Sequence, residues 1–312
     1  MNGILIIDKP AGITSHDVVA RCRRILKTKR VGHTGTLDPF ATGVMVVLVG
    51  QATRLAQFLD KDAKEYEALV RFGFETDTGD RTGEKRITNY ELREISAEEI
   101  EEALPEFRGE IEQTPPMYSA KKIAGKKLYE LAREGIEIER EPVKITIYEL
   151  ELIEQRRCRD AEINDKTKDE GQRTKDFCLR VLCSAGTYIR VLAEDVGKKL
   201  KTGAHLAELR RTRAGKFGIE KASTLEQLEE TVASGNLETV LISMNEAAAH
   251  LPEIVLSEAD VKKTQNGMKL KFETDEIADG QPVRMCDEKK NLIAVGFYSA
   301  AEKLVQPKTV LV

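Results

Sequence analysis

The residues best suited to chemistry lie in one short stretch, GHTGTLDP at residues 32–39. Its glycines, hydroxyl groups and proline indicate a loop, and the apolar run Val44–Val49 after it indicates a strand buried on both faces. The chain has only four histidines, and His33 lies here, close before Asp38. A loop that leads into a rigid buried strand can hold a reactive carboxylate in place.

Asp38 is the first candidate. An isolated Asp titrates at about 3.9, so at neutral pH it is an anion that could act as a nucleophile or a base. If it is buried it needs a cation, and an arginine serves best because it stays charged and binds both carboxylate oxygens. Spacing does not indicate which arginine. The alternative, that Asp38-Pro39 only starts a turn, is equally compatible with the spacing.

Other chemistries find less support. A phosphate-binding P-loop requires a Lys that the glycine-rich stretch lacks, and neither G-x-S-x-G nor H-E-x-x-H occurs. His33 and Asp38 could be two metal ligands, but no third ligand stands at a recognisable spacing. We therefore predict that the protein binds no metal.

Strands and helices must position this loop, and the apolar periodicity predicts both kinds of element. We expect Ser15 to cap a first helix, Thr187 to cap a later helix that Gly197 ends, and Lys126–Glu134 to form a helix. The expected strands are Gly3–Asp8, Val44–Val49, Tyr66–Phe72, Val143–Leu152 with a one-residue slip, and Phe177–Cys183. Strands and helices mixed without a regular alternation predict an α+β fold.

The totals describe an ordinary globular protein, with 312 residues, 41% hydrophobic and 33% charged. No apolar run approaches the roughly 20 residues of a membrane span, and the first residues do not resemble a signal peptide. The five cysteines are odd in number and form no C-x-x-C, which predicts free thiols and a reducing compartment. We expect a cytoplasmic protein.

Charge is unevenly distributed although the net charge is only −4. The segments Arg21–Arg30 and Lys198–Lys216 are basic, and Glu91–Glu112 is acidic. Such blocks could form a basic face for nucleic acid and an acidic back, or each could be the solvated side of one helix.

Two regions depart from the rest of the chain. Of the 22 residues of Gln155–Asp176, 13 are charged, which predicts an extended, mobile hairpin extension. Near Leu251-Pro252 the pattern changes to short strands and turns. We therefore expect a catalytic domain at 1–250 and a small β-rich domain at 251–312.

Several segments, in order along nearly the whole chain, resemble the TruB family of RNA pseudouridine synthases. RVGHTGTLDPFATGVMVVLVGQATR carries the G-H-x-G-x-L-D-P core of that family. The other similar segments are DKPAGITSHDVV, KEYEALVRFGFETDTGD, TPPMYSAKKIAGKKLYELAREG, CSAGTYIRVLAEDVG and GAHLAELRRTRAGKF. The resemblance implies a mixed, largely antiparallel sheet flanked by helices, an RNA-gripping insertion at about 112–142, and a C-terminal PUA-like RNA-binding domain.

The resemblance also implies roles in the site. Asp38 would be the nucleophile that attacks a uridine, at the sugar C1′ or the ring C6, and Arg190 would be its ion-pair partner. Tyr66 would stack on the target base and assist the final proton loss. Tyr188 and Leu209 would line the base pocket. Lys9, with Pro10, would support the pocket without acting as a catalyst.

Two further roles concern the RNA. His33 would be a wedge that fills the gap left by a flipped base and stacks on its neighbours. Phosphate contacts that do not read sequence would come from four lysines of the insertion, namely Lys121, Lys122, Lys126 and Lys127.

The implied reaction is isomerisation of the T-loop uridine of tRNA to pseudouridine by a stand-alone monomer, with no cofactor, metal, guide RNA or protein partner. The insertion favours the bacterial, tRNA-acting branch over the guide-RNA-dependent one. Thr36, Phe40 and the long 155–176 segment depart from the family pattern. The alternatives are a non-catalytic RNA-binding or tRNA-folding chaperone on the same scaffold and a metal-dependent RNA hydrolase.

Overall fold

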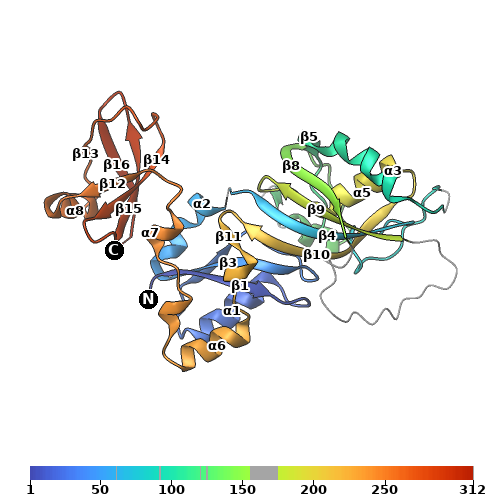
Figure 1. Cartoon of the computed structure of the whole chain (residues 1–312), viewed down its shortest axis with the longest axis horizontal. Helices are drawn as coiled ribbons and strands as arrows, with labels where there is room; N and C mark the ends of the chain where they lie inside the picture. The colour runs from blue at the N-terminus through green and yellow to red at the C-terminus, as the bar shows by residue number, and fades with distance from the viewer. Residues whose placement is uncertain (61, 91–92, 120, 124–125, 155–174, 312) are drawn as a thin grey trace.

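The computed structural model describes residues 1–60, 62–90, 93–119, 121–123, 126–154 and 175–311 (Figure 1). Within these residues the main sheet has the order β1-β3-β10-β4-β9-β8-β5, with β2 paired to β3 and β11 to β10. Its strands are β1 (Gly3–Lys9), β2 (Val31–Thr34), β3 (Thr42–Val49), β4 (Lys64–Phe72), β5 (Gly109–Gln113), β8 (Val143–Ile153), β9 (Lys175–Cys183), β10 (Ala204–Ala214) and β11 (Phe217–Gly218). The expected α+β class with a mixed, largely antiparallel sheet is confirmed, because only β10 and β3 pair in parallel here.

Helices cover both faces of this sheet. They are α1 (Ser15–Ile25), α2 (Ala56–Leu59), α3 (Ala97–Ala103), α4 (Leu128–Arg133), α5 (Ile189–Lys199), α6 (Leu225–Ala233) and α7 (Met244–Ala247). A short hairpin of β6 (Lys122–Ile123) and β7 (Lys126–Lys127) precedes α4. The helix expected from Lys126 therefore starts two residues later, since the backbone of Lys126 and Lys127 pairs as a strand.

The predicted burial of Val44–Val49 on both faces is confirmed. Alternate residues of β1 and β3 point to opposite sides of the sheet, as the strand repeat requires. One set packs with α1 and α6, and the other set packs with α2, α7 and the C-terminal sheet. A third core lies on the other half of the sheet, where α3 and α5 pack against β4, β8, β9 and β10.

The sequence patterns predicted most helices and strands correctly but misplaced some helix ends. The slip in β8 is a β-bulge between Ile147 and Glu149. Thr14, not Ser15, caps α1, in a capping box with Asp17, which leaves the Ser15 side chain free for a contact with the Asp38 loop. Tyr188, not Thr187, is the N-cap of α5 and makes no side-chain cap bond, while the Thr187 hydroxyl donates to Ser184 O.

Gly197 does not end α5, which runs on to Lys199. A glycine at this position lets α5 pack closely against the start of β10. A Cβ at Gly197 would lie 2.4 Å from Ala204 N, the first residue of β10. The helix therefore approaches β10 at a distance that only glycine permits.

The two halves of the main sheet meet at β10. It pairs with β3 through only Arg210↔Thr42 and Arg211↔Gly43, and with β4 along its whole length. Gly43 has φ +99°, and a Cβ there would lie 2.2 Å from Arg211 O. Glycine thus permits the one close backbone approach that joins β3 to β10.

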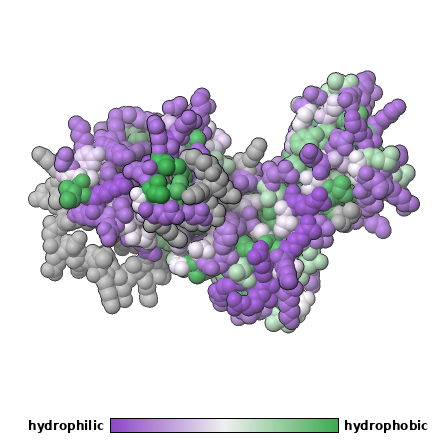
Figure 2. Space-filling view, turned by 180° about the vertical axis from the view of Figure 1, so that it is seen from behind, coloured by the Kyte–Doolittle hydropathy of each residue, from purple (hydrophilic) through white to green (hydrophobic). Residues whose placement is uncertain are grey.

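The C-terminal sheet has the order β12-β14-β15-β16-β13 and stands at one end of the molecule (Figure 1). Its elements are β12 (Glu253–Leu256), α8 (Glu258–Gln265), β13 (Leu270–Lys271), β14 (Pro282–Asp287), β15 (Leu292–Ser299) and β16 (Leu304–Val310). It has its own core, and Leu292, Val295 and Leu311 also pack with the core beneath β1. Seen from behind, its surface and that of the main body are mostly hydrophilic with small apolar patches (Figure 2). The division at 250/251 stays a prediction.

Three expectations about the rest of the chain can be compared with the structure. Residues 155–174 of the expected hairpin extension lie outside the described residues, and Lys175 and Asp176 belong to β9. The thiols of Cys22, Cys183 and Cys286 are free, but the expectation is wrong for Cys178, which is disulfide-bonded. Across the described ranges, no helix has the length and apolar character of a membrane span.

We predict that Gly197→Ala destabilises the fold, because the new methyl group would force α5 away from the backbone of β10. Overpacking of this kind costs about 1–3 kcal/mol. Urea denaturation would measure the loss. Gly32→Ala is the control, because its Cβ would meet only Thr53 Cγ2 at 3.7 Å, an ordinary contact. Equal stability of the two variants would contradict the packing argument.

Candidate active site

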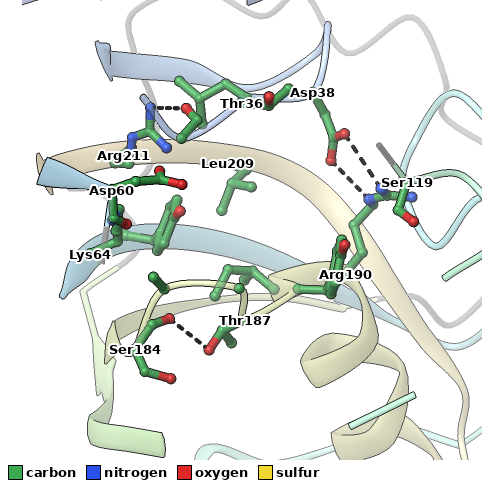
Figure 3. Close-up of a pocket in the computed structure, with 17 residues that line it drawn as sticks. Thr36, Asp38, Asp60, Lys64, Ser119, Ser184, Thr187, Arg190, Leu209 and Arg211 are labelled. Atoms are coloured by element: carbon green, nitrogen blue, oxygen red, sulfur yellow. Dashed lines mark hydrogen bonds and ion pairs between the residues drawn. The ribbon is translucent and has the colours of Figure 1, made fainter. Parts of the chain in front are cut away.

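A pocket opens on β10 where the two halves of the sheet meet (Figure 3). One wall is the loop at residues 35–38, between β2 and β3, and the opposite wall is the turn at residues 184–188 with the start of α5. The floor is formed by β4 and β10, and Ser119 of the 112–142 segment closes one side. Five predicted site residues line the pocket together: Asp38, Tyr66, Tyr188, Arg190 and Leu209.

Asp38 and Arg190 form a two-point ion pair although they are 152 residues apart in sequence. Arg190 Nε lies 2.9 Å from Asp38 Oδ2, and Nη2 lies 3.4 Å from Oδ1 (Figure 3). The Arg190 side chain is 4% exposed, whereas that of Asp38 is 35% exposed. The guanidinium is therefore enclosed, and the carboxylate faces the pocket.

Backbone carbonyls complete the shell of Arg190. Its Nη1 donates to Thr78 O at 2.8 Å, and its Nη2 donates to Tyr118 O at 2.7 Å. Both acceptors come from loops, one after β4 and one in the 112–142 segment. Because Nε, Nη1 and Nη2 of Arg190 all have acceptors, the guanidinium has one orientation. The Asp38 carboxylate that it binds is therefore also fixed.

A second carboxylate lies near the pair. Asp80 Oδ2 is 4.0 Å from Arg190 Nε, and its Oδ1 accepts bonds from Thr78 and Thr82 within its own turn. Burial raises the pKa of Asp38 above the ordinary value, Arg190 lowers it, and the charge of Asp80 raises it. Asp38 thus titrates above the usual range of an aspartate.

The loop that carries Asp38 is anchored on both sides of that residue. Ser15 Oγ accepts from Leu37 N at 2.9 Å and donates to Leu37 O at 3.1 Å. Lys9 Nζ donates to Ala41 O at 2.6 Å and to Pro39 O at 3.1 Å. Lys9 is fully buried, and burial lowers its pKa to about 8. It therefore contacts the loop from behind, outside the pocket lining.

Arg211 also lines the pocket, and it is not among the residues expected from the sequence. It is buried, its Nε donates to Val44 O, and its Nη2 donates to Gly35 O at the start of the Asp38 loop. Its guanidinium lowers the pKa of the Tyr66 hydroxyl, against the larger effect of burial. A signal existed in the strand pattern, because Arg211 lies two residues after Leu209 and so faces the same side.

The remaining pocket residues are held by local contacts. Gln113 Nε2 donates to Tyr188 O at 3.0 Å, and Tyr188 N donates to Gln113 Oε1 at 2.7 Å. This pairing fixes the entry into α5, two residues before Arg190. Tyr66, on β4, is buried, and burial raises the pKa of its hydroxyl. Lys64 Nζ donates to Asp60 O and Asp62 O at the pocket edge.

His33 does not line the pocket. It lies on β2, two residues before Gly35, and its ring stands edge-on to that of His16 with 5.7 Å between centroids. Burial lowers the pKa of His33, and His16 lowers it further, so the ring is neutral at pH 7. An acid–base or metal pair of His33 with Asp38 finds no support in this arrangement.

The residues of the basic sequence segments do not all lie free on the surface. Arg211 is buried, and Arg210 forms an ion pair with Asp8 at 2.7 Å, so these two do not belong to a free basic surface. Lys121 is half-buried before the β6–β7 hairpin. The side chains of the other three predicted phosphate-binding lysines, Lys122, Lys126 and Lys127, lie outside the described part of the chain.

Comparison with known proteins gives concordant results. Residues 23–189 match the family model of the TruB family pseudouridylate synthase N-terminal domain, and residues 190–249 match that of the tRNA pseudouridylate synthase B C-terminal domain. The chain is 46% identical over 88% of its length to tRNA pseudouridine synthase B of Bacillus anthracis, covering 85% of that protein. It is 42% identical to the protein of the same name from Bacillus cytotoxicus, over 100% of this chain and 98% of that one.

A solved structure supports the same assignment. The chain resembles a protein in the crystal structure of a Cbf5-Nop10-Gar1 complex, with a TM-score of 0.72 and 28% identity. The match covers 99% of this chain and 85% of the other. Sequence and fold therefore agree over both sheets, and the chain belongs to the TruB family of pseudouridylate synthases.

Proposed function

We propose that this protein converts the T-loop uridine of tRNA to pseudouridine. As a member of its family it is a pseudouridine synthase, an isomerase. The tRNA substrate is supported by relatives that are named tRNA pseudouridine synthase B. The choice of the T-loop uridine rests on the sequence resemblance.

The observation that carries the proposal is the enclosed ion pair of Asp38 and Arg190. A nucleophile must be an anion that is accessible to substrate, and it must be held in one orientation. Arg190 binds the carboxylate at two points, and two backbone carbonyls bind the guanidinium. Asp38 attacks the target uridine, and the bond between N1 of the uracil and C1′ of the ribose breaks. The base then bonds to C1′ through C5, the bond to Asp38 is released, C5 loses its proton and N1 gains one.

Other pocket residues contact the uracil base. Tyr66 stacks on the uracil ring, while Leu209 and Tyr188 form the apolar wall beside it. The raised pKa of Tyr66 keeps its hydroxyl protonated at neutral pH, which suits stacking. Tyr66 also assists the final proton loss, in which C5 of the uracil gives up its proton after the bond between C5 and C1′ has formed. The Arg211 guanidinium lowers the pKa of the Tyr66 hydroxyl and so opposes the effect of burial.

His33 stacks on the RNA bases and takes no part in proton transfer. Extrusion of a stacked base costs a few kcal/mol, and a planar ring that stacks in the vacated space recovers part of that cost. The lowered pKa of His33 makes its ring neutral, which is consistent with stacking. Lys121, with its neighbours in the 112–142 insertion, contacts the RNA backbone.

The enzyme acts as a monomer in the cytoplasm, with no cofactor, metal, guide RNA or protein partner. The crystal structure it resembles contains Cbf5 with Nop10 and Gar1. The higher identity to proteins named tRNA pseudouridine synthase B favours the stand-alone mode for this chain. Pseudouridine formation in unmodified tRNA by the purified protein alone tests it. No product without added guide RNA would overturn the stand-alone assignment.

Asp38→Asn should abolish pseudouridine formation while tRNA binding persists. The amide keeps the shape of the carboxylate but cannot act as the nucleophile, so we expect a loss of more than about a thousandfold in single-turnover rate. Filter binding of tRNA is the control, because a misfolded variant would lose affinity as well. Retention of activity by this variant would show that another group attacks the uridine.

The rate should fall as pH falls through the pKa of Asp38. Because that pKa is raised, the active anion is present only above it, and the acid limb should lie above the ordinary aspartate range. Asp80→Asn removes a charge that raises this pKa, so its acid limb should move to lower pH. Single-turnover pH profiles of both proteins measure the shift. A shift to higher pH in the variant would contradict this electrostatic account.

His33→Ala should lower the rate on folded tRNA by about tenfold to a hundredfold, the equivalent of one lost stacking contact. His33→Phe should retain most of the activity, because a neutral planar ring remains. The defect should shrink on an unstructured oligonucleotide, where the target base needs no extrusion. If the Phe variant were as impaired as the Ala variant, the imidazole nitrogens and not the ring face would matter.

A further inference from the structure

A serine in the pocket wall has no role in the chemistry described so far. Ser119 lines the pocket beside Asp38 and Arg190, and its side chain lies near that ion pair (Figure 3). The residue is 5% exposed, and its Oγ is buried without a hydrogen-bond partner within the residues that the structure describes. A buried hydroxyl in this state loses about 1–3 kcal/mol relative to one with a partner.

The hydroxyl groups of Ser184 and Thr187, on the opposite wall, are already engaged. Ser184 Oγ accepts from Thr146 N at 2.9 Å, and the Thr187 hydroxyl donates to Ser184 O at 2.9 Å. Ser119 is therefore not one of several equivalent wall serines. Its hydroxyl is left with both its donor and its acceptor capacity in a pocket that receives the substrate.

The backbone holds Ser119 in a fixed relation to the nucleophile. Ser119 N donates to Met117 O, and the carbonyl of the preceding residue, Tyr118, accepts from Arg190 Nη2 at 2.7 Å. Arg190 in turn binds Asp38. The position of the serine is thus tied through two contacts to the carboxylate that attacks the uridine.

We propose that Ser119 Oγ binds the ribose 2′-hydroxyl of the target nucleotide and so contributes to the choice of RNA over DNA. The inference rests on the proposed function of Asp38. The 2′-hydroxyl is on C2′, which is bonded to C1′, and C6 of the base is two bonds from C1′. For attack at either carbon, a group next to Asp38 lies near that hydroxyl.

The chemistry of the two partners is complementary. A serine hydroxyl donates one hydrogen bond and accepts others, and a ribose 2′-hydroxyl does the same. Uracil carbonyls and phosphate oxygens only accept, so they would use the donor of Ser119 alone. The 2′-hydroxyl can use both capacities of an otherwise unpartnered group, and it is the group by which proteins distinguish RNA from DNA.

A two-by-two comparison tests the contact. Wild type and Ser119→Ala would each be assayed, in single turnover, on a T-arm RNA with uridine or with 2′-deoxyuridine at the target position. If the hydroxyl groups bind each other, either single change should cost about tenfold, and the second change should add little. The proposal would be overturned if the rate losses from Ser119→Ala and from 2′-deoxyuridine multiplied when both changes were combined. It would also be overturned if Ser119→Ala had unchanged activity on the uridine RNA.

Ser184→Ala is the matched control, because it removes a pocket-wall hydroxyl that already has a partner in the chain. Its preference for uridine over 2′-deoxyuridine should equal that of wild type. Thermal unfolding provides a second readout. Ser119→Ala should leave the midpoint unchanged or slightly raised, since it removes an unpaired buried group, whereas Ser184→Ala should lower it.

Two failures can be distinguished. If wild type made no pseudouridine on the uridine RNA, the proposed function would be wrong. If wild type were active but Ser119→Ala kept the full wild-type preference for uridine, only the role of Ser119 would be wrong. A drop in the melting midpoint of Ser119→Ala would also contradict the inference, because the hydroxyl would then have a partner inside the protein.

Discussion

The enclosed charge of Arg190 is the constraint around which the site is built. A guanidinium that is 4% exposed has lost nearly all its water and must find acceptors in the protein. It donates hydrogen bonds to the Asp38 carboxylate and to two carbonyls, which come from three separate loops. Each loop must therefore approach the start of α5, and two of the three loops also line the pocket, through residues 35–38 and Ser119.

The same logic applies to the loop that carries Asp38. It buries Leu37, Phe40 and Ala41 in the core, and polar side chains from α1, β1 and β10 hold its backbone. Ser15, Lys9 and Arg211 bind its carbonyls, and two of the three are themselves buried cations. Because these contacts are made to the loop backbone, the Asp38 side chain is left to face the pocket. The anchoring residues thus limit the motion of the Asp38 carboxylate.

Most elements could be predicted from apolar periodicity alone. The two-sided burial of β3, the slip in β8 and the stripe of α1 are local consequences of which side chains avoid water. The ends of helices were less predictable. Thr14 and Ser15 are both good caps by type, and the choice between them depended on a contact with Leu37, 22 residues away in sequence.

The sequence by itself determined the residue types at the site and the faces that the strands bury. Its resemblance to a family also indicated Asp38, Arg190 and Tyr66. Only the tertiary structure decided how these residues are held: the two-point geometry of the ion pair, the nearby Asp80, the inward Arg211, and Ser119 Oγ, which lacks a partner among the described residues. The physical reason is that the apolar periodicity of a segment indicates which of its own side chains are buried, but not which distant residues they contact. Hydrogen bonds between loops depend on where the packed sheet and helices bring distant segments together.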